Sequence, residues 1–156
     1  MPSASRKPFI GVIGAGQCNS EITTKAFELG QEIARSGAIL VCGGLGGVMR
    51  AVSKGARAEG GVTIGVIPGD SKEDANEYID YPICTGMGQA RNLVIINTAD
   101  VLIAVAGQYG TLSEIGFARK SGKPVISLGS WEIDDSIVRA ENAKEAVQLA
   151  LQAIQG

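Results

Sequence analysis

Short apolar runs that end in glycine recur along this chain, and each is followed by residues with helical spacing. The run at residues 9–13 ends in a Gly-Ala-Gly loop, and the run at 38–42 ends in a loop with four glycines, 43–47. Runs of this length are typical of buried strands. Strands that alternate with amphipathic helices predict a parallel sheet covered on both faces. The sequence therefore predicts a doubly wound α/β fold.

The same pattern extends to the C-terminus. We expect strands at residues 9–13, 38–42, 62–67, 82–84, 101–105 and 124–128. We expect helices from Asn19 or Ser20 to Gly37, then at 48–59, 89–98 and 111–121, and a last one capped by Asn142. Residues 70–81 are expected to form a surface loop. Residues 1–8 are expected to be a flexible lead-in, and 9–156 a single ligand-binding domain, because 156 residues suit one core.

Three glycine-containing loops, 14–16, 43–47 and 107–111, follow predicted strands. Glycine allows the backbone to approach a ligand closely. In open parallel sheets, ligands bind outside the carboxyl ends of the strands, where all three loops fall. This placement favours a ligand site over plain turns.

The third loop leads into a predicted helix that carries Thr111 and Glu114. The first N–H groups of a helix have no partner and favour an anion, so the segment can be a phosphate-binding turn with a carboxylate beside it. It can equally be an ordinary turn with Thr111 as N-cap and Glu114 as its capping-box partner. The segment alone leaves both interpretations open.

Composition excludes several classes of function. A net charge of −2 and 4% aromatic residues argue against nucleic-acid and anionic-membrane partners. The sequence has no histidine, which removes Ser-His, Cys-His and histidine-ligated metal chemistry. The three cysteines lack metal-site spacing; we expect Cys42 and Cys84 to be buried and Cys18 to lie in a loop. No signal peptide or membrane-length run is recognised, so we expect a cytoplasmic protein.

Two nucleotide motifs are incomplete or missing. Gly14 and Gly16 begin a dinucleotide fingerprint, but Asn19 stands at the position of its final glycine. The second strand ends in Cys42 and Gly43, not in an acid that could bind a ribose. No phosphate-binding G-x-x-x-x-G-K-[ST] sequence occurs. We therefore expect neither an NAD site nor an ATPase.

Three motifs in order carry a more specific signal: GGLGGVM at 43–49, GMGQARN at 86–92 and GQYGTLSE at 107–114. Together they resemble the family once labelled "lysine decarboxylase-like". This family includes the LONELY GUY phosphoribohydrolases and the molybdenum cofactor carrier proteins. The resemblance runs from Phe9 to the last helix and implies a Rossmann-like fold. Nothing in the sequence suggests a lysine that binds pyridoxal phosphate.

The two branches of this family differ at the third loop and after Arg91. The hydrolases have a P-G-G-x-G-T-x-x-E loop and a lysine after the catalytic arginine. This chain keeps Gly110, Thr111 and Glu114, but it lacks the proline and the second glycine, and Arg91 is followed by Asn92. The resemblance therefore favours a carrier that binds, stores or transfers the molybdenum cofactor. The alternative is a nucleoside 5'-monophosphate phosphoribohydrolase in which Arg91 and Glu114 are catalytic.

The carrier interpretation implies a pterin or nucleotide phosphate as ligand and no metal bound directly by the protein. It also implies a homodimer or homotetramer, with molybdoenzymes or cofactor-synthesis proteins as partners. We expect Arg91 to reach the surface and to pair with Glu114 in the empty protein. The predicted binding residues are Gly14, Gly16, Gly43, Gly44, Gly46, Gly47, Met49, Arg91, Asn92, Gly107, Gln108, Tyr109, Gly110, Thr111 and Glu114.

Overall fold

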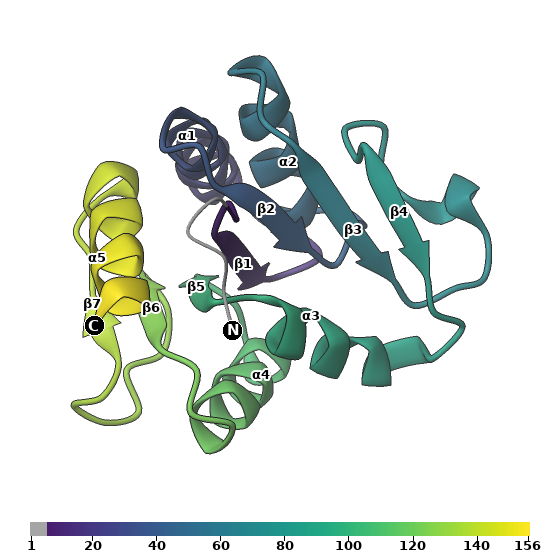
Figure 1. The fold of residues 1–156 in the computed structure, drawn as a ribbon. Coiled ribbons are helices and arrows are strands. Elements are labelled where there is room, and N and C mark those ends of the chain that lie inside the picture. The colour runs from purple at the N-terminus through teal and green to yellow at the C-terminus, as the bar shows by residue number, and fades with distance from the viewer. Residues whose placement is uncertain (1–5) are drawn as a thin grey trace.

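All strands of the central sheet run parallel (Figure 1). The computed structural model describes residues 6–156, so most of the expected lead-in at 1–8 lies outside the described residues. The seven-stranded sheet has the order β4-β3-β2-β1-β5-β6-β7. The strands are β1 (Phe9–Gly14), β2 (Ile39–Cys42), β3 (Thr63–Ile67), β4 (Tyr81–Cys84), β5 (Val101–Val105), β6 (Val125–Leu128) and β7 (Val138–Arg139). The parallel α/β fold is thereby confirmed.

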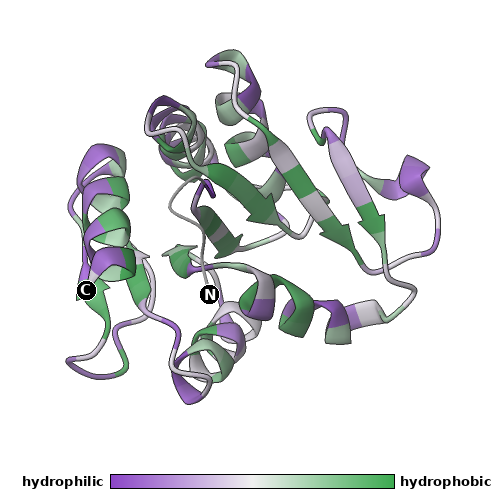
Figure 2. Cartoon of the chain, viewed as in Figure 1, coloured by the Kyte–Doolittle hydropathy of each residue, from purple (hydrophilic) through white to green (hydrophobic). Residues whose placement is uncertain are grey.

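Helices cover both faces of the sheet (Figure 1). The α-helices are α1 (Ser20–Arg35), α2 (Val48–Ala58), α3 (Asn92–Thr98), α4 (Tyr109–Lys120) and α5 (Ala143–Gln155), with 3-10 turns η1 (Lys72–Asp74) and η2 (Gly88–Arg91). Two buried apolar clusters separate the layers, one beneath α1, α2 and α5 and the other beneath α3 and α4. The apolar sides of the helices face the largely apolar strands in Figure 2. None of the described helices is long and apolar enough to cross a membrane.

The strand order reverses beside β1, which pairs with β2 on one side and β5 on the other. The chain leaves β1 through α1 in one direction along the sheet, and it later leaves β5 through α4 in the other. The loops that diverge from such a switch point leave a crevice at the carboxyl ends of the strands. The glycine loops after β1 and β5 lie on either side of that crevice.

Local corrections concern the second half of the chain. The expected helix at 89–98 is split into η2 and α3. Helix α4 begins at Tyr109 with Gln108 as N-cap and no side-chain cap, so the capping-box interpretation of Thr111 and Glu114 is wrong. Cys84 is exposed rather than buried, because it lies on the edge strand β4. The two-residue strand β7 was not predicted. Of the two predicted candidates, Asn19 and not Ser20 caps α1, and the predicted cap of α5 at Asn142 is confirmed.

Helices α1 and α2 pack backbone against backbone. A Cβ atom added at Gly30 of α1 would strike the carbonyl oxygen of Val52 and lie 2.7 Å from the amide nitrogen of Ala56. A Cβ at Gly55 of α2 would strike the carbonyl oxygen of Phe27. Backbone atoms cannot swing aside as a flexible side chain can, so both positions require glycine.

This contact predicts opposite effects for two helical glycines. Gly30→Ala should lower the free energy of unfolding by about 1–3 kcal/mol, because the added methyl forces α1 and α2 apart. Gly116→Ala in α4 is the matched control, since nothing lies within 4 Å of a Cβ added there. That change should raise the free energy of unfolding by about 0.4–1 kcal/mol. Urea denaturation of both variants checks this, and an unchanged Gly30→Ala protein would contradict the close packing.

Candidate functional site

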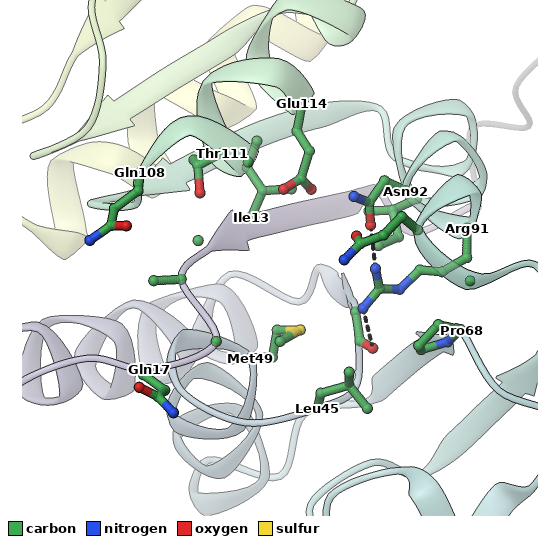
Figure 3. A pocket seen from close by; sticks show the side chains of 18 residues that line it. Ile13, Gln17, Leu45, Met49, Pro68, Arg91, Asn92, Gln108, Thr111 and Glu114 are labelled. Atoms are coloured by element: carbon green, nitrogen blue, oxygen red, sulfur yellow. Dashed lines mark hydrogen bonds between the residues drawn. The ribbon is translucent and has the colours of Figure 1, made fainter.

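A pocket of about 620 Å³ lies at the carboxyl ends of the central strands (Figure 3). Its walls come from the loops after β1, β2 and β3, from η2 and α3, and from the start of α4. The lining residues are Ile13, Gly14, Ala15, Gly16, Gln17, Gly43, Leu45, Met49, Pro68, Gly88, Gln89, Arg91, Asn92, Ile95, Gln108, Gly110, Thr111 and Glu114. The pocket therefore lies at the switch point beside β1, at the carboxyl ends of the strands.

Most of the predicted binding residues line this pocket. They are Gly14, Gly16, Gly43, Met49, Arg91, Asn92, Gln108, Gly110, Thr111 and Glu114. The segments that contribute them are up to a hundred residues apart in sequence. The sheet brings them together because the carboxyl ends of its parallel strands share one edge.

The other predicted residues, Gly44, Gly46, Gly47, Gly107 and Tyr109, do not line the pocket. Gly47 has φ +62°, and a Cβ there would strike the backbone of the β1 loop. Gly107 has φ +95°, and a Cβ there would strike the side chain of Thr111. Tight packing of the loops therefore requires glycine at both positions. Tyr109 is 79% exposed, and its ring stacks on that of Trp131 with the ring centroids 5.9 Å apart.

Arg91 is buried, with 6% of its surface exposed, whereas we expected it to reach the surface. Its Nε donates to the carbonyl oxygen of Val66 at 2.8 Å, and its Nη2 donates to that of Gly43 at 3.3 Å. Its Nη1 donates to Oδ1 of Asn92. The dashed lines in Figure 3 mark the bonds to Asn92 and to Gly43. The expected pairing with Glu114 is wrong: the ion pairs among residues 6–156 do not include it. Backbone carbonyls at the ends of two strands hold the guanidinium instead.

Glu114 and Arg91 still influence each other across the pocket. Burial raises the pKa of Glu114 to about 7, and the charge of Arg91 opposes this rise. Burial lowers the pKa of Arg91, while Glu114 and Cys42 oppose that shift. A carboxyl group with a pKa near 7 exchanges a proton readily at neutral pH. When protonated, it can also donate a hydrogen bond to an anion.

The start of α4 supplies the second polar feature of the pocket. The first helical bond closes from the amide of Leu112 to the carbonyl of Gln108 at 3.0 Å, so the amides before Leu112 have no partner within the helix. The first turn carries no acidic residue. Gly110 and Thr111 from this turn line the pocket, and Thr111 is buried beneath it. The positive end of the helix dipole therefore faces the cavity.

Sequence reasoning missed several lining residues, among them Ala15, Gln17, Leu45, Pro68 and Gln89. The sequence carried a signal for four of them. Ala15 and Leu45 lie in loops already assigned to the site, Gln17 directly follows the first of these loops, and Pro68 directly follows a predicted strand. A rule that takes the residues just after each parallel strand would have found these four. Among the residues that the structure describes, no group of three His, Cys, Asp or Glu side chains could hold a metal ion.

The raised pKa of Glu114 predicts how stability depends on pH. The ordinary value is 4.5 and the folded value is about 7, so the folded state holds this proton more tightly. The contribution is fully present below pH 4.5 and is lost as pH rises through 7. Between pH 5 and pH 8, wild type should therefore lose roughly 2–4 kcal/mol of stability relative to Glu114→Gln.

Urea titrations of wild type and Glu114→Gln at both pH values measure this difference. Glu28→Gln, at an exposed position on α1, is the matched control and should follow wild type. Parallel pH profiles for wild type and Glu114→Gln would show that the carboxyl group is not desolvated.

Comparison with known proteins agrees with this geometry. Among solved structures, the molybdenum cofactor binding protein of the phototrophic bacterium Rippkaea orientalis has a TM-score of 0.91 at 34% identity, covering 98% of this chain and 100% of that one. The molybdenum cofactor carrier protein of Chlamydomonas reinhardtii has a TM-score of 0.88 at 35% identity, covering 96% and 100%.

A curated relative lies in the other branch. The cytokinin riboside 5'-monophosphate phosphoribohydrolase of Mycobacterium tuberculosis is 35% identical over 127 residues, which cover 75% of this chain and 67% of the relative. Residues 7–155 match the model of the SLOG cluster4 family. Because this match spans nearly the whole chain, the protein belongs to the SLOG cluster4 family.

Proposed function

We propose that this protein binds the molybdenum cofactor, or a close pterin phosphate, and stores it or hands it on. The observation that carries the proposal is the pocket itself, which joins a backbone wall at Gly43 to the amide end of α4. The similarity to two solved structures named as molybdenum cofactor binding or carrier proteins supports it. The cofactor is here a cargo, not a catalyst.

The anionic end of such a ligand fits the start of α4. The free amides of the first turn and the hydroxyl group of Thr111 are donors that a phosphate accepts. Glu114 lies one turn further on, and its raised pKa reduces the repulsion that a carboxylate would exert. The side that takes the anion therefore carries little competing negative charge.

The ring of the ligand fits the opposite wall. Gly43 is enclosed so tightly that an added Cβ would lie 2.6 Å from Sδ of Met49 and 2.7 Å from Nη2 of Arg91. Backbone is therefore the only surface that this position can present. Leu45 and Pro68 add apolar contacts beside it. A cavity of about 620 Å³ is of the size that small-molecule ligands occupy.

The cofactor would supply its own sulfur ligands, so no cysteine has to face it. Cys42 is fully buried and does not line the pocket. No lysine is found among the lining residues, which argues against a Schiff base with pyridoxal phosphate. The incomplete fingerprint at Gly14 and Gly16 argues against NAD.

We further propose that the protein is a cytoplasmic homodimer or homotetramer. We also propose that it exchanges its ligand with molybdoenzymes or cofactor-synthesis proteins. The exposed Leu93 on α3 and Phe117 on α4 support self-association, because they leave apolar surface for a second copy to cover.

A phosphoribohydrolase is the second candidate, and Glu114 is the observation that favours it. A carboxyl group with a pKa near 7 suits general acid–base chemistry on an N-glycosidic bond. Arg91 argues against it, because Val66 and Gly43 already accept hydrogen bonds from its guanidinium. We therefore rank binding above hydrolysis.

The proposed function predicts a specific ligand and a specific loss of affinity. Mass spectrometry of material released from the purified protein should find a pterin phosphate. Thr111→Val removes the hydroxyl donor but keeps the buried shape, and should cost roughly 1.5–3 kcal/mol of affinity for that ligand. Ser113→Ala, on the exposed side of α4, is the matched control and should bind as wild type does. Unchanged affinity in Thr111→Val would remove the proposed anion site.

We expect this protein to hydrolyse AMP and cytokinin monophosphates at a negligible rate. The reason is that the guanidinium of Arg91 is engaged by backbone carbonyls and is not free to act on substrate. The assay is release of free base, measured by chromatography. Turnover on the order of 1 per second or faster, abolished by Glu114→Ala, would make the protein a hydrolase.

A further inference from the structure

A second pocket, of about 540 Å³, lies beside the first, between α1 and α2. Its lining residues are Gly16, Gln17, Cys18, Thr23, Thr24, Phe27, Gly47, Arg50, Ala51 and Lys54. Gly16 and Gln17 also line the first pocket, so the two cavities meet at the loop after β1. The proposed function makes no use of this second cavity.

The second pocket is cationic. It contains Arg50 and Lys54 and no carboxylate. Arg50 is already engaged, because it forms a bidentate pair with Glu77 at 2.8 and 2.9 Å and lies over the ring of Tyr78. Lys54 takes part in none of the ion pairs among residues 6–156. The charge of Lys54 helps to lower the pKa of Glu77, but Lys54 forms no ion pair with that carboxylate, so its ammonium group can contact a ligand.

The rest of the lining suits a ring and a sugar. Phe27 and Ala51 provide an apolar wall. The hydroxyl groups of Thr23 and Thr24 donate to the backbone carbonyls of Asn19 and Ser20, so both hydroxyl oxygens act as acceptors. The thiol of Cys18 donates to Oγ1 of Thr23 at 3.2 Å, which leaves this oxygen one further lone pair for a ligand. Nucleosides carry both an apolar ring and donor hydroxyl groups, so a nucleoside matches this combination.

The junction between the pockets is open. Gly16 is exposed, and nothing lies within 4 Å of a Cβ added there. A phosphate chain can therefore pass over its backbone without meeting a side chain. The two cavities can hold the two halves of one elongated molecule.

We propose that the second pocket binds a nucleotide extension of the ligand in the first pocket. The ligand class is a dinucleotide-like molecule whose two halves are joined through phosphates that cross Gly16 and lie near Lys54. The proposal rests on the proposed function, because the first half of the ligand occupies the first pocket. In this proposal Lys54 makes the protein bind the dinucleotide-like ligand more tightly than a ligand that fills the first pocket alone.

Cys18 reports on the second pocket. It lines that cavity and not the first, and it is half-buried. Of the other two cysteines, Cys42 is buried and Cys84 is exposed on β4. In a Cys84→Ser protein, maleimide modification therefore measures access to Cys18.

The experiment compares AMP with diadenosine diphosphate, which carries a second adenosine. In the Cys84→Ser protein, diadenosine diphosphate should bind about tenfold more tightly than AMP. The reason is the additional charge-assisted contact between Lys54 and a phosphate of the longer molecule. It should also slow the modification of Cys18, whereas AMP should not. Lys54→Ala should abolish the tenfold preference and leave the affinity for AMP unchanged. Lys144→Ala on α5, which lines neither pocket, is the matched control and should keep the preference.

Equal affinities for the two probes, an unprotected Cys18, or a preference that survives Lys54→Ala would each overturn the proposal. Retained binding of AMP in any of these cases would leave the first pocket intact. If neither AMP nor diadenosine diphosphate binds, the proposal that the second pocket holds a nucleotide extension is also overturned. The mass of the ligand released from the purified protein tests the proposed function separately.

Discussion

The buried guanidinium of Arg91 holds the site together. It donates to the carbonyl oxygens of Gly43 and Val66, at the carboxyl ends of β2 and β3, from the turn that leads into α3. Three segments far apart in sequence therefore share one rigid donor group. A buried carbonyl group without a hydrogen-bond donor costs free energy. Arg91 avoids this cost for the carbonyls at the ends of β2 and β3, because it donates to both of them. Arg91 therefore links the loop after β2, the end of β3 and the start of α3 at the first pocket.

The position of Arg91 also determines the electrostatics of the pocket. Its charge lies deep in the protein, where burial lowers its pKa, and Glu114 faces it without forming an ion pair. A closer contact would hold Glu114 ionised. At its actual position the carboxyl group titrates near neutrality instead. The pocket therefore keeps one cation fixed and one proton exchangeable, beside the amide end of α4.

The fold could be predicted from the sequence because it depends on local patterns. Apolar runs ended by glycine gave the strands of the central sheet, and helical spacing gave the helices between them. The destination of Arg91 could not be predicted, because its acceptors come from strands 25 and 48 residues away. Cys84 looked like a core residue, since an apolar run does not reveal that its strand lies at an edge. A glycine in a loop does not by itself distinguish a ligand contact from close packing, and packing alone requires glycine at Gly47 and Gly107.

The backbone contact between α1 and α2 has a consequence for how the protein recognises its ligand. At Gly30 and Gly55 the backbones of the two helices touch with no side chain between them, so the helices cannot come closer together at these points. This backbone contact fixes the width of the groove between α1 and α2, where the second pocket lies. For the ligand proposed for the second pocket, this fixed width limits which molecules can fit between α1 and α2.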